Sequence, residues 1–194
     1  MSNRGAVFFD LDDTLIDSTG LLIPDALRRT AEALGVTPER LDATGKTTAD
    51  VTGPLGPLAP DRLSAADRAW NSPDVPPLDP VPGARELLAT LRPPLLLFLV
   101  TRGDAARQQQ KIDRAGLREA FDAIRIRPPC SGSKRDDFAA LAKEWSLEPT
   151  RCVVIGDDRA DEIAHGDALG FRTILVPDTP LRTVPQVLRN WRIL

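Results

Sequence analysis

Two aspartates and a threonine follow a short apolar run near the start of the chain. The run covers residues 6–9, and Asp10, Asp12 and Thr14 stand at alternate positions after it. Four consecutive apolar residues, rich in β-favouring types, predict a strand buried on both faces, as in a parallel sheet. A carboxylate at the C-terminal end of such a strand lies where open α/β sheets bind ligands. Alone, an aspartate-rich turn could equally be a helix N-cap or a tight turn.

Polar side chains also follow three later segments. Thr101 ends the apolar run 95–100, Lys134 begins the helix expected after the third strand, and Asp157 follows the apolar run 152–155. Because the C-terminal ends of parallel strands meet at one edge of a sheet, we expect these side chains to gather there. Carboxylate oxygens suit a hard cation such as Mg²⁺.

In this order, four motifs resemble those of the haloacid dehalogenase-like (HAD-like) superfamily. They are Asp-x-Asp-x-Thr at 10–14, a strand-end threonine at 101, a lysine at 134 and Gly-Asp-x-x-x-Asp at 156–161. Most members of this superfamily are Mg²⁺-dependent phosphatases. The chain is similar to the phosphatase branch with a small cap inserted after the first strand. The resemblance covers nearly the whole chain, and the cap is the part it defines least.

The resemblance implies a role for each of the first two aspartates. Asp10 would be the nucleophile that takes the phosphoryl group as an aspartyl-phosphate. Asp12 would protonate the leaving oxygen and then activate the water that hydrolyses the phosphoenzyme. Family members that cleave carbon–halogen bonds lack an aspartate at this second position, so its presence points to phosphate esters.

The resemblance also implies a phosphate-binding group. Thr101 would donate its hydroxyl hydrogen to the transferring phosphoryl group. Lys134 would offset the charge of the phosphate and keep Asp10 ionised. Backbone N–H groups of Arg102 and Gly103 would assist, because a helix N-terminus favours anions.

A Mg²⁺ site follows from the same resemblance. Its ligands would be the carboxylate of Asp10, the main-chain carbonyl of Asp12 and the carboxylate of Asp157, completed by waters and a phosphate oxygen. Asp158 or Asp161 would support the metal through water or orient Lys134, and both assignments stay open.

Arg102 departs from the usual family pattern, which often has Asn or another small polar residue there. Its guanidinium would bind a second anionic group of the substrate, or it would pair with Asp104 or an acidic residue of the cap. Taken singly, several of these polar residues have ordinary explanations as capping, turn or surface groups: Thr14, Thr101, Lys134, Asp13, Asp17 and His165.

Composition narrows the classes of partner. The chain of 194 residues carries a net charge of -3, and its pI is near 5.3. A general nucleic-acid or membrane-surface binder would normally be basic, so we expect a small phosphorylated substrate and no nucleic-acid or membrane partner. We expect a monomer or a homodimer.

The apolar runs and the cysteines indicate the cellular setting. The run 95–100 is far shorter than the roughly 20 residues of a membrane helix, and the first residues lack the apolar segment of a signal peptide. Two cysteines, Cys130 and Cys152, cannot form a disulfide framework. The single histidine, His165, offers little to a soft metal. We therefore expect a cytoplasmic protein.

Strands and helices are expected to alternate along the chain. The expected strands are 6–9, 95–100, 121–126, 152–155 and 172–176. The expected helices are 21–34, a short one from 37 to 41, 61–70, 84–91, 104–115, one beginning at 133–134, 162–169 and 184–191. This alternation predicts an α/β fold, a doubly wound parallel sheet with a Rossmann-like core.

Residues 53–82 interrupt the alternation with eight prolines between the first and second strands. We therefore predict a core formed by 1–16 and 81–194, with a small, helical, proline-rich cap at 17–80. The cap would cover the strand ends with a fairly open entrance. Apolar residues in the proline-rich stretch, such as Trp70, argue against a flexible linker.

Three other functions compete with a phosphatase. A phosphomutase of the same family would use the same aspartyl-phosphate but return the phosphate to its substrate. A signalling receiver domain also uses Asp, Thr and Lys around a parallel sheet, although its phosphorylated aspartate follows a later strand. A non-catalytic binding protein on the same fold is the third.

Overall fold

A parallel β-sheet forms the centre of the molecule. The computed structural model describes residues 4–45, 47–129, 131–176 and 178–194. The strand order is β3-β2-β1-β4-β5, and every pairing is parallel. The strands are β1 (Ala6–Phe9), β2 (Leu96–Arg102), β3 (Ala123–Arg127), β4 (Cys152–Gly156) and β5 (Arg172–Leu175). The predicted doubly wound α/β fold is confirmed.

Alternate side chains of the central strands supply two separate cores. Val7 and Phe9 of β1 face one apolar cluster, whereas Ala6 and Phe8 face the other. The first is covered by α5 (Ala84–Leu91), α6 (Ala105–Arg114) and α9 (Val184–Asn190), and the second by α7 (Lys134–Glu144) and α8 (Ala164–Ala168). Both faces are buried because each is covered by helices, which is why β1 is apolar throughout.

The first turns of α6 and α7 are fixed by local capping. Asp104 caps α6 by accepting a hydrogen bond from the backbone N–H of Arg107. Ser133 and Asp136 form a capping box at the start of α7. Both helices begin at the C-terminal edge of the sheet, so capping presents Lys134 to that edge in the first turn of α7.

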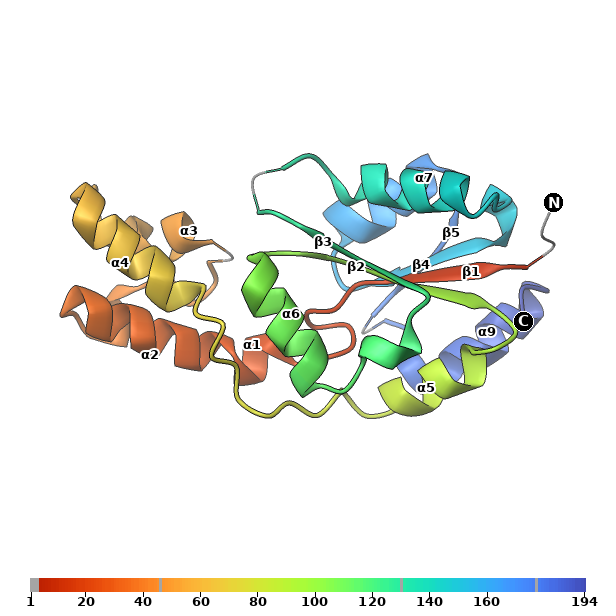
Figure 1. Cartoon of the computed structure of the whole chain (residues 1–194), viewed down its shortest axis with the longest axis horizontal. Helices are drawn as coiled ribbons and strands as arrows, with labels where there is room; N and C mark the ends of the chain where they lie inside the picture. The colour runs from red at the N-terminus through yellow and green to blue at the C-terminus, as the bar shows by residue number, and fades with distance from the viewer. Residues whose placement is uncertain (1–3, 46, 130, 177) are drawn as a thin grey trace.

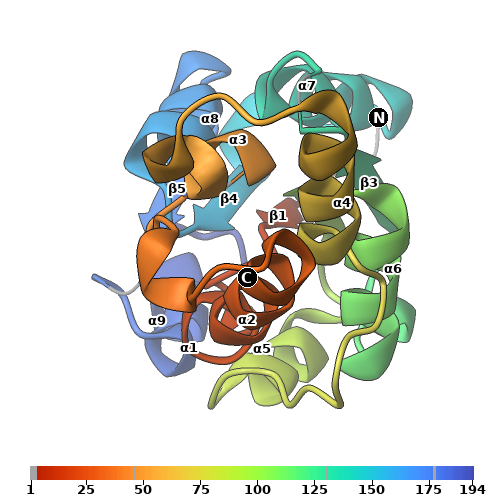
Figure 2. The same ribbon diagram turned by 90° about the vertical axis from the view of Figure 1, so that its left-hand side faces the viewer.

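Residues 17–45 and 47–80 form a helical layer beyond the C-terminal ends of the strands (Figures 1 and 2). It contains α1 (Ser18–Leu21), α2 (Ile23–Leu34), a 3₁₀ turn (Pro38–Arg40), α3 (Thr48–Thr52), a second 3₁₀ turn (Gly53–Leu55) and α4 (Pro60–Trp70). Helices α2 and α4 pack around an apolar cluster of their own that includes Leu27 and Trp70. This helical layer thus has a small core separate from the two cores of the sheet.

Some predicted elements differ from those in the structure. The helix expected at 21–34 begins at Ser18 and is divided at Leu22, where Pro24 lies in the first turn of the second piece. Helix α3 was not expected, because it has only five residues and is set by a capping box between Thr47 and Asp50 rather than by apolar periodicity. A π turn over Arg159–Ile163 precedes α8, where a plain helix was expected.

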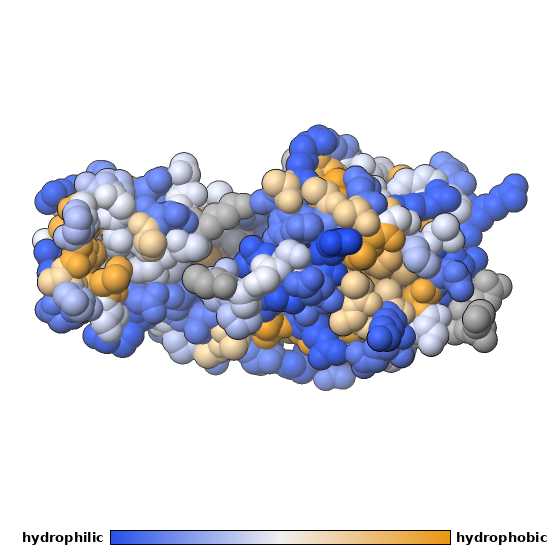
Figure 3. Space-filling model, turned by 90° about the horizontal axis from the view of Figure 1, so that it is seen from above, coloured by the Kyte–Doolittle hydropathy of each residue, from blue (hydrophilic) through white to orange (hydrophobic). Residues whose placement is uncertain are grey.

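The surface, the lengths of the helices and the cysteines can be compared with what the sequence predicts. Seen from above, this helical layer forms a lobe at one end of the molecule, with polar and apolar residues mixed over the face in view (Figure 3). In the described residues, no helix has the length and apolar character needed to cross a membrane. Cys152 is a buried free thiol whose pKa is raised to about 12 by burial, and Cys130 lies outside the described residues.

Candidate active site

Asp10 lies at the C-terminal end of the central strand. Its backbone N–H donates to the carbonyl of Ile155 at 2.9 Å, which continues the pairing of β1 with β4 by one residue. In the sheet, β2 and β3 lie on one side of β1, and β4 and β5 lie on the other, so the strand order reverses at β1. Ligands of open α/β sheets bind at such a reversal of strand order, so the position of Asp10 is that of a ligand-binding group.

Lys134 joins Asp10 to a second buried acid, Glu162. The lysine Nζ donates to Asp10 Oδ1 at 2.6 Å and also to Glu162 Oε1. At most 4% of any of these three residues is exposed. Burial opposes the charge on Lys134, but the two carboxylates outweigh burial and raise the pKa of the lysine. The lysine is therefore held as a cation beside Asp10.

Three carboxylates share this part of the site. Oxygen atoms of Asp10, Asp157 and Glu162 lie within 4.8 Å of one another. Burial raises the pKa of Asp10 to about 7 even though Lys134 opposes the shift, and burial also raises the pKa of Glu162. One lysine thus does not balance the negative charge. This set of oxygen donors fits a hard divalent cation such as Mg²⁺.

The carboxylate cluster contains one residue that the sequence motifs did not include. Asp10 and Asp157 are in the cluster, as expected, but the third carboxylate belongs to Glu162. Glu162 was not singled out because it follows Asp161, the last residue of the motif. The π turn brings Glu162 onto Lys134, and such turns recur at functional sites. Its place directly after the motif was the only sequence signal for it.

The Asp12 side chain is directed away from that cluster, toward α6. Its Oδ1 accepts from Lys111 Nζ at 2.7 Å and from the Ser18 hydroxyl, and its Oδ2 accepts from Gln108 Nε2 at 2.9 Å. Burial alone would raise the pKa of Asp12, but these donors, with Lys111 the strongest, hold the pKa below its usual value. These contacts therefore favour the ionised form of Asp12.

Thr101 and Gly103 lie on the same rim. Thr101 is buried, and its Oγ1 accepts from Gln108 Nε2 at 2.6 Å. The backbone N–H of Gly103, expected to bind phosphate, donates to the carbonyl of Arg127 at 2.9 Å. That amide is engaged in extending the β2–β3 pairing, which the sequence motif did not reveal.

Arg102 finds an acidic partner on a different element from those expected. Its Nη2 lies 3.5 Å from Asp161 Oδ2, and the same nitrogen donates to the carbonyl of Gly132 at 3.5 Å. Asp104, one expected partner, instead caps α6. The guanidinium therefore links β2 to the turn that follows β4.

Asp158 and Asp161 occupy the turn after β4 and play different structural roles. Asp158 Oδ1 accepts from the backbone N–H groups of Ala160 and Asp161 and so caps the π turn. Asp161 Oδ2 lies 4.0 Å from Lys134 Nζ, and Asp161 Oδ1 is 2.8 Å from His165 Nδ1. One role considered for Asp158 or Asp161 was to orient Lys134. The closest contact with Lys134 in the turn is instead made by Glu162.

A cavity of about 570 Å³ opens beside Asp157. Asp13, Asp17 and Asp79 line it, together with Leu21 and the segment 80–82. This cavity lies between the proposed metal ligands and the two segments that join the cap to the core.

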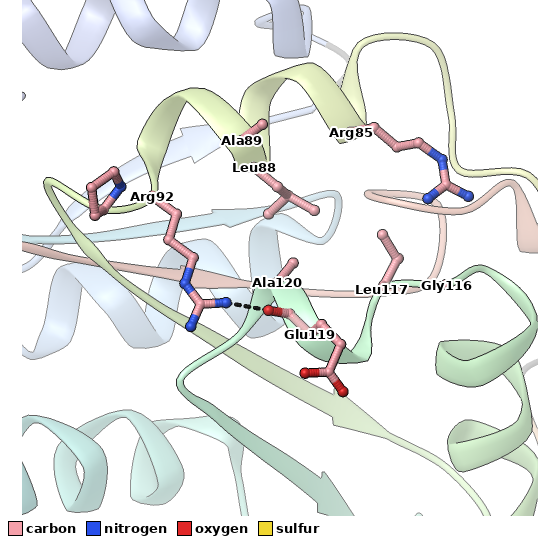
Figure 4. Close-up of a pocket in the computed structure, with 9 residues that line it drawn as sticks. Arg85, Leu88, Ala89, Arg92, Gly116, Leu117, Glu119 and Ala120 are labelled. Atoms are coloured by element: carbon pink, nitrogen blue, oxygen red, sulfur yellow. Dashed lines mark hydrogen bonds between the residues drawn. The ribbon is translucent and has the colours of Figure 1, made fainter.

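A second cavity, of about 440 Å³, lies away from these residues, between α5 and the segment that leads from α6 to β3 (Figure 4). Arg85 and Arg92 stand at its two ends, with Leu88 and Leu117 between them. Arg85 donates to the carbonyl of Ala115, and Arg92 donates to that of Glu119. Both guanidinium groups thus hold neighbouring backbone in place.

Comparison with known proteins places the chain in a family. A family model described as haloacid dehalogenase-like hydrolase matches residues 5–168. Pyrimidine 5'-nucleotidase YjjG of Escherichia coli is 31% identical over 98 residues, which cover 48% of this chain and 43% of that protein. Glyceraldehyde 3-phosphate phosphatase of Pyrococcus abyssi is 25% identical over 191 residues, which cover 87% of this chain and 79% of that protein.

A solved structure of similar fold is that of the putative HAD-hydrolase YfnB from Bacillus subtilis bound to magnesium. Its TM-score is 0.73 at 18% identity, with 98% of this chain and all of that chain covered. The fold is a doubly wound α/β fold, and the site gathers carboxylates and a lysine at the C-terminal ends of its strands. The chain belongs to the haloacid dehalogenase-like hydrolases. The resemblance inferred from the four motifs and the prediction of a phosphoric monoester hydrolase are both confirmed.

Proposed function

We propose that this chain is a Mg²⁺-dependent phosphatase that hydrolyses a small phosphorylated metabolite through an aspartyl-phosphate on Asp10. The observation that carries this proposal is the buried contact of Asp10 with Lys134 beside the carboxylates of Asp157 and Glu162. A nucleotidase and a sugar-phosphate phosphatase among the relatives support a small phosphate ester as substrate. Their different substrates single out no one metabolite.

The proposed Mg²⁺ ligands are the carboxylates of Asp10, Asp157 and Glu162 and the main-chain carbonyl of Asp12. When bound, the cation supplies positive charge that offsets the repulsion between these acids and a phosphate. Lys134 adds a second positive charge on the side of Asp10. Together they let an anionic nucleophile approach an anionic substrate.

The reaction is proposed to proceed in two displacements at phosphorus. An oxygen of Asp10 attacks phosphorus, the bond to the leaving oxygen breaks, and Asp12 gives that oxygen a proton. Asp12 then takes a proton from water, the water oxygen attacks phosphorus, and the bond to Asp10 breaks. The contacts of Asp12 lower its pKa and favour the ionised form that the second displacement requires, so Asp12 must take up a proton before the first.

Thr101 and Lys134 are proposed to bind the phosphoryl oxygens as charge shifts among them. Arg102, at the same rim, is proposed to bind through its guanidinium any second anionic group of the substrate. Asp158 and Asp161 would support this arrangement from the turn after β4.

The segment 17–80 is proposed to act as the cap, which excludes water and selects the leaving group. Its position over the strand ends supports this role (Figure 1). We further propose a cytoplasmic location and a monomeric or homodimeric state, with no nucleic-acid or membrane partner. The net charge of -3 supports the latter point.

A panel of phosphate esters with purified protein and Mg²⁺ tests the proposal. We expect phosphate release from at least one sugar phosphate or nucleoside monophosphate, and its loss in Asp10→Asn. Phosphate release also separates hydrolysis from the mutase reaction, which would return phosphate to its substrate. No release from any ester would overturn the proposal.

A further inference from the structure

Gln108 connects two of the proposed catalytic side chains through one nitrogen atom. It lies in α6, with 1% of its surface exposed. Its Nε2 donates to Thr101 Oγ1 at 2.6 Å and to Asp12 Oδ2 at 2.9 Å. Gln108 lies seven residues after the strand-end threonine, and the sequence motifs did not include it.

The chemistry of Asp12 fixes the orientation of this amide. Lys111 and the Ser18 hydroxyl donate to Asp12 Oδ1. Asp12 Oδ2 faces Gln108 Nε2, so the NH₂ end of Gln108 is the end that contacts Asp12. The same NH₂ group then reaches Thr101 with its second hydrogen. A turned amide would place its carbonyl oxygen against the Asp12 carboxylate, which is repulsive.

The amide also determines what the Thr101 hydroxyl can do. A hydroxyl has one hydrogen to donate and two lone pairs that accept. Because Gln108 Nε2 can only donate, it occupies a lone pair of Thr101 and leaves the hydroxyl hydrogen free. Among the described residues, no acceptor takes that hydrogen from Thr101, although the side chain is buried.

Gly103 leaves the space that Gln108 needs. A Cβ atom at Gly103 would lie 3.0 Å from both Cδ and Cγ of Gln108, and φ at this glycine is +153°, which disfavours other residues. The next residue, Asp104, caps α6 and so fixes the helix that carries Gln108. The turn after β2 thereby holds the amide in one place.

We propose that Gln108 is a positioning residue that holds the Thr101 hydroxyl as a hydrogen-bond donor toward the transferring phosphoryl group. The same amide restrains the Asp12 carboxylate beside it. This inference rests on the proposed phosphatase function, since it assigns Thr101 to a phosphoryl oxygen. A buried glutamine with a purely structural role would affect folding without acting through Thr101.

A double-mutant cycle separates the two cases. The variants are Gln108→Met, Thr101→Val and the pair, with Gln110→Met on the same helix as a matched control. Each is assayed for inhibition by orthovanadate, which mimics the transferring phosphoryl group, during hydrolysis of p-nitrophenyl phosphate with Mg²⁺. Thermal unfolding checks that each variant is folded.

We expect Gln108→Met to raise the vanadate inhibition constant about tenfold or more, because a misplaced donor loses its contact. In the Thr101→Val background the same change should add less than about threefold, and Gln110→Met should match the wild type. Effects of Gln108→Met and Thr101→Val that simply multiply, or an unchanged constant in folded Gln108→Met, would overturn the inference.

A near-isosteric variant covers the case in which Gln108→Met does not fold. Gln108→Glu offers an acceptor to Thr101, so the hydroxyl hydrogen turns away from phosphate, and vanadate inhibition should weaken by a similar factor. Wild-type inhibition in Gln108→Glu would contradict the proposal. If the wild-type protein hydrolyses no ester, the proposed function itself is wrong. That result is distinguishable from every outcome of the double-mutant cycle, because the cycle requires an active wild type.

Discussion

Asp10 is a buried acid in surroundings that disfavour its charge. Its contact with Lys134 favours the ionised form, but burial and the nearby Glu162 prevail and raise its pKa to about 7. Asp12, two residues later, has its pKa lowered instead, because Lys111 and two further donors surround it. The two acids therefore differ in protonation at one pH, as their separate proposed roles require.

The raised pKa of Asp10 predicts how the stability of the metal-free protein depends on pH. The folded state binds this proton more tightly than the unfolded state, whose pKa is near 3.8. The stabilising contribution is therefore present below pH 4 and is lost as the pH rises through about 7. Asn cannot ionise, so Asp10→Asn should gain stability relative to wild type between pH 5 and pH 8.

Thermal unfolding in the presence of a chelator measures this effect. We expect the melting temperature of Asp10→Asn minus that of the wild type to grow by about 4 °C or more from pH 5 to pH 8. Asp79→Asn, at an exposed carboxylate, serves as the control and should show no such growth. A difference for Asp10→Asn that does not change with pH would contradict the interpretation.

At the scale of elements, the π turn after β4 decides which acid reaches the site. The turn directs Glu162 inward to Lys134, whereas Asp161 contacts Arg102 and His165 nearer the surface. Helix α6 acts similarly on the other side, since Gln108 and Lys111 lie on the face directed to Asp12. The rotation of the π turn and of α6 about their axes thus determines which of their side chains face the site.

Glu162 is therefore expected to contribute more to Mg²⁺ binding than Asp161. Glu162→Gln should weaken Mg²⁺ affinity about tenfold or more, while Asp161→Asn should change it by less than about threefold. Isothermal titration calorimetry with MgCl₂ measures both. The opposite order of effects would show that the cation is held by the residue of the sequence motif.

The sequence predicted the elements whose residue pattern is strong. The strands could be predicted because most of them are apolar runs in the sequence. Lys134 and Asp157 could be placed near Asp10 because parallel strands end at one edge of the sheet. Glu162 and Gln108 could not be identified, because their inward direction depends on a π turn and on helix rotation. The short helix α3 has no periodic pattern to reveal it.

At the scale of the whole molecule, Arg107 joins the core to the segment around the end of α4, and Arg29 of α2 holds the same segment from within 17–80. Arg107 of α6 donates to the carbonyl of Trp70, the last residue of α4, and to the carbonyl of Ser72 just beyond it. Arg29 of α2 donates to the carbonyls of Ala69 and Asp74 in the same segment. Burial, and then the neighbouring Arg29, lower the pKa of Arg107. This contact fixes the C-terminal end of the cap over the strand ends.

Removing this contact should loosen the cap. Arg107→Met leaves two carbonyls without their charged donor, so we expect a loss of about 2 kcal/mol in the free energy of unfolding. Amide hydrogen exchange in α4 should also become faster. Arg114→Met, an exposed residue of the same helix, is the control and should behave as wild type in both measurements. Unchanged exchange in α4 of Arg107→Met would show that other contacts hold the cap.

The most direct test of the central claim is the detection of a phosphoryl group on Asp10. The protein is mixed with Mg²⁺ and an accepted ester, quenched in acid within the first turnover, and digested for mass spectrometry. We expect the added mass of one phosphoryl group on the peptide that contains Asp10, absent in Asp10→Asn. Phosphate release by the wild type while this peptide stays unmodified throughout the turnover would contradict the account.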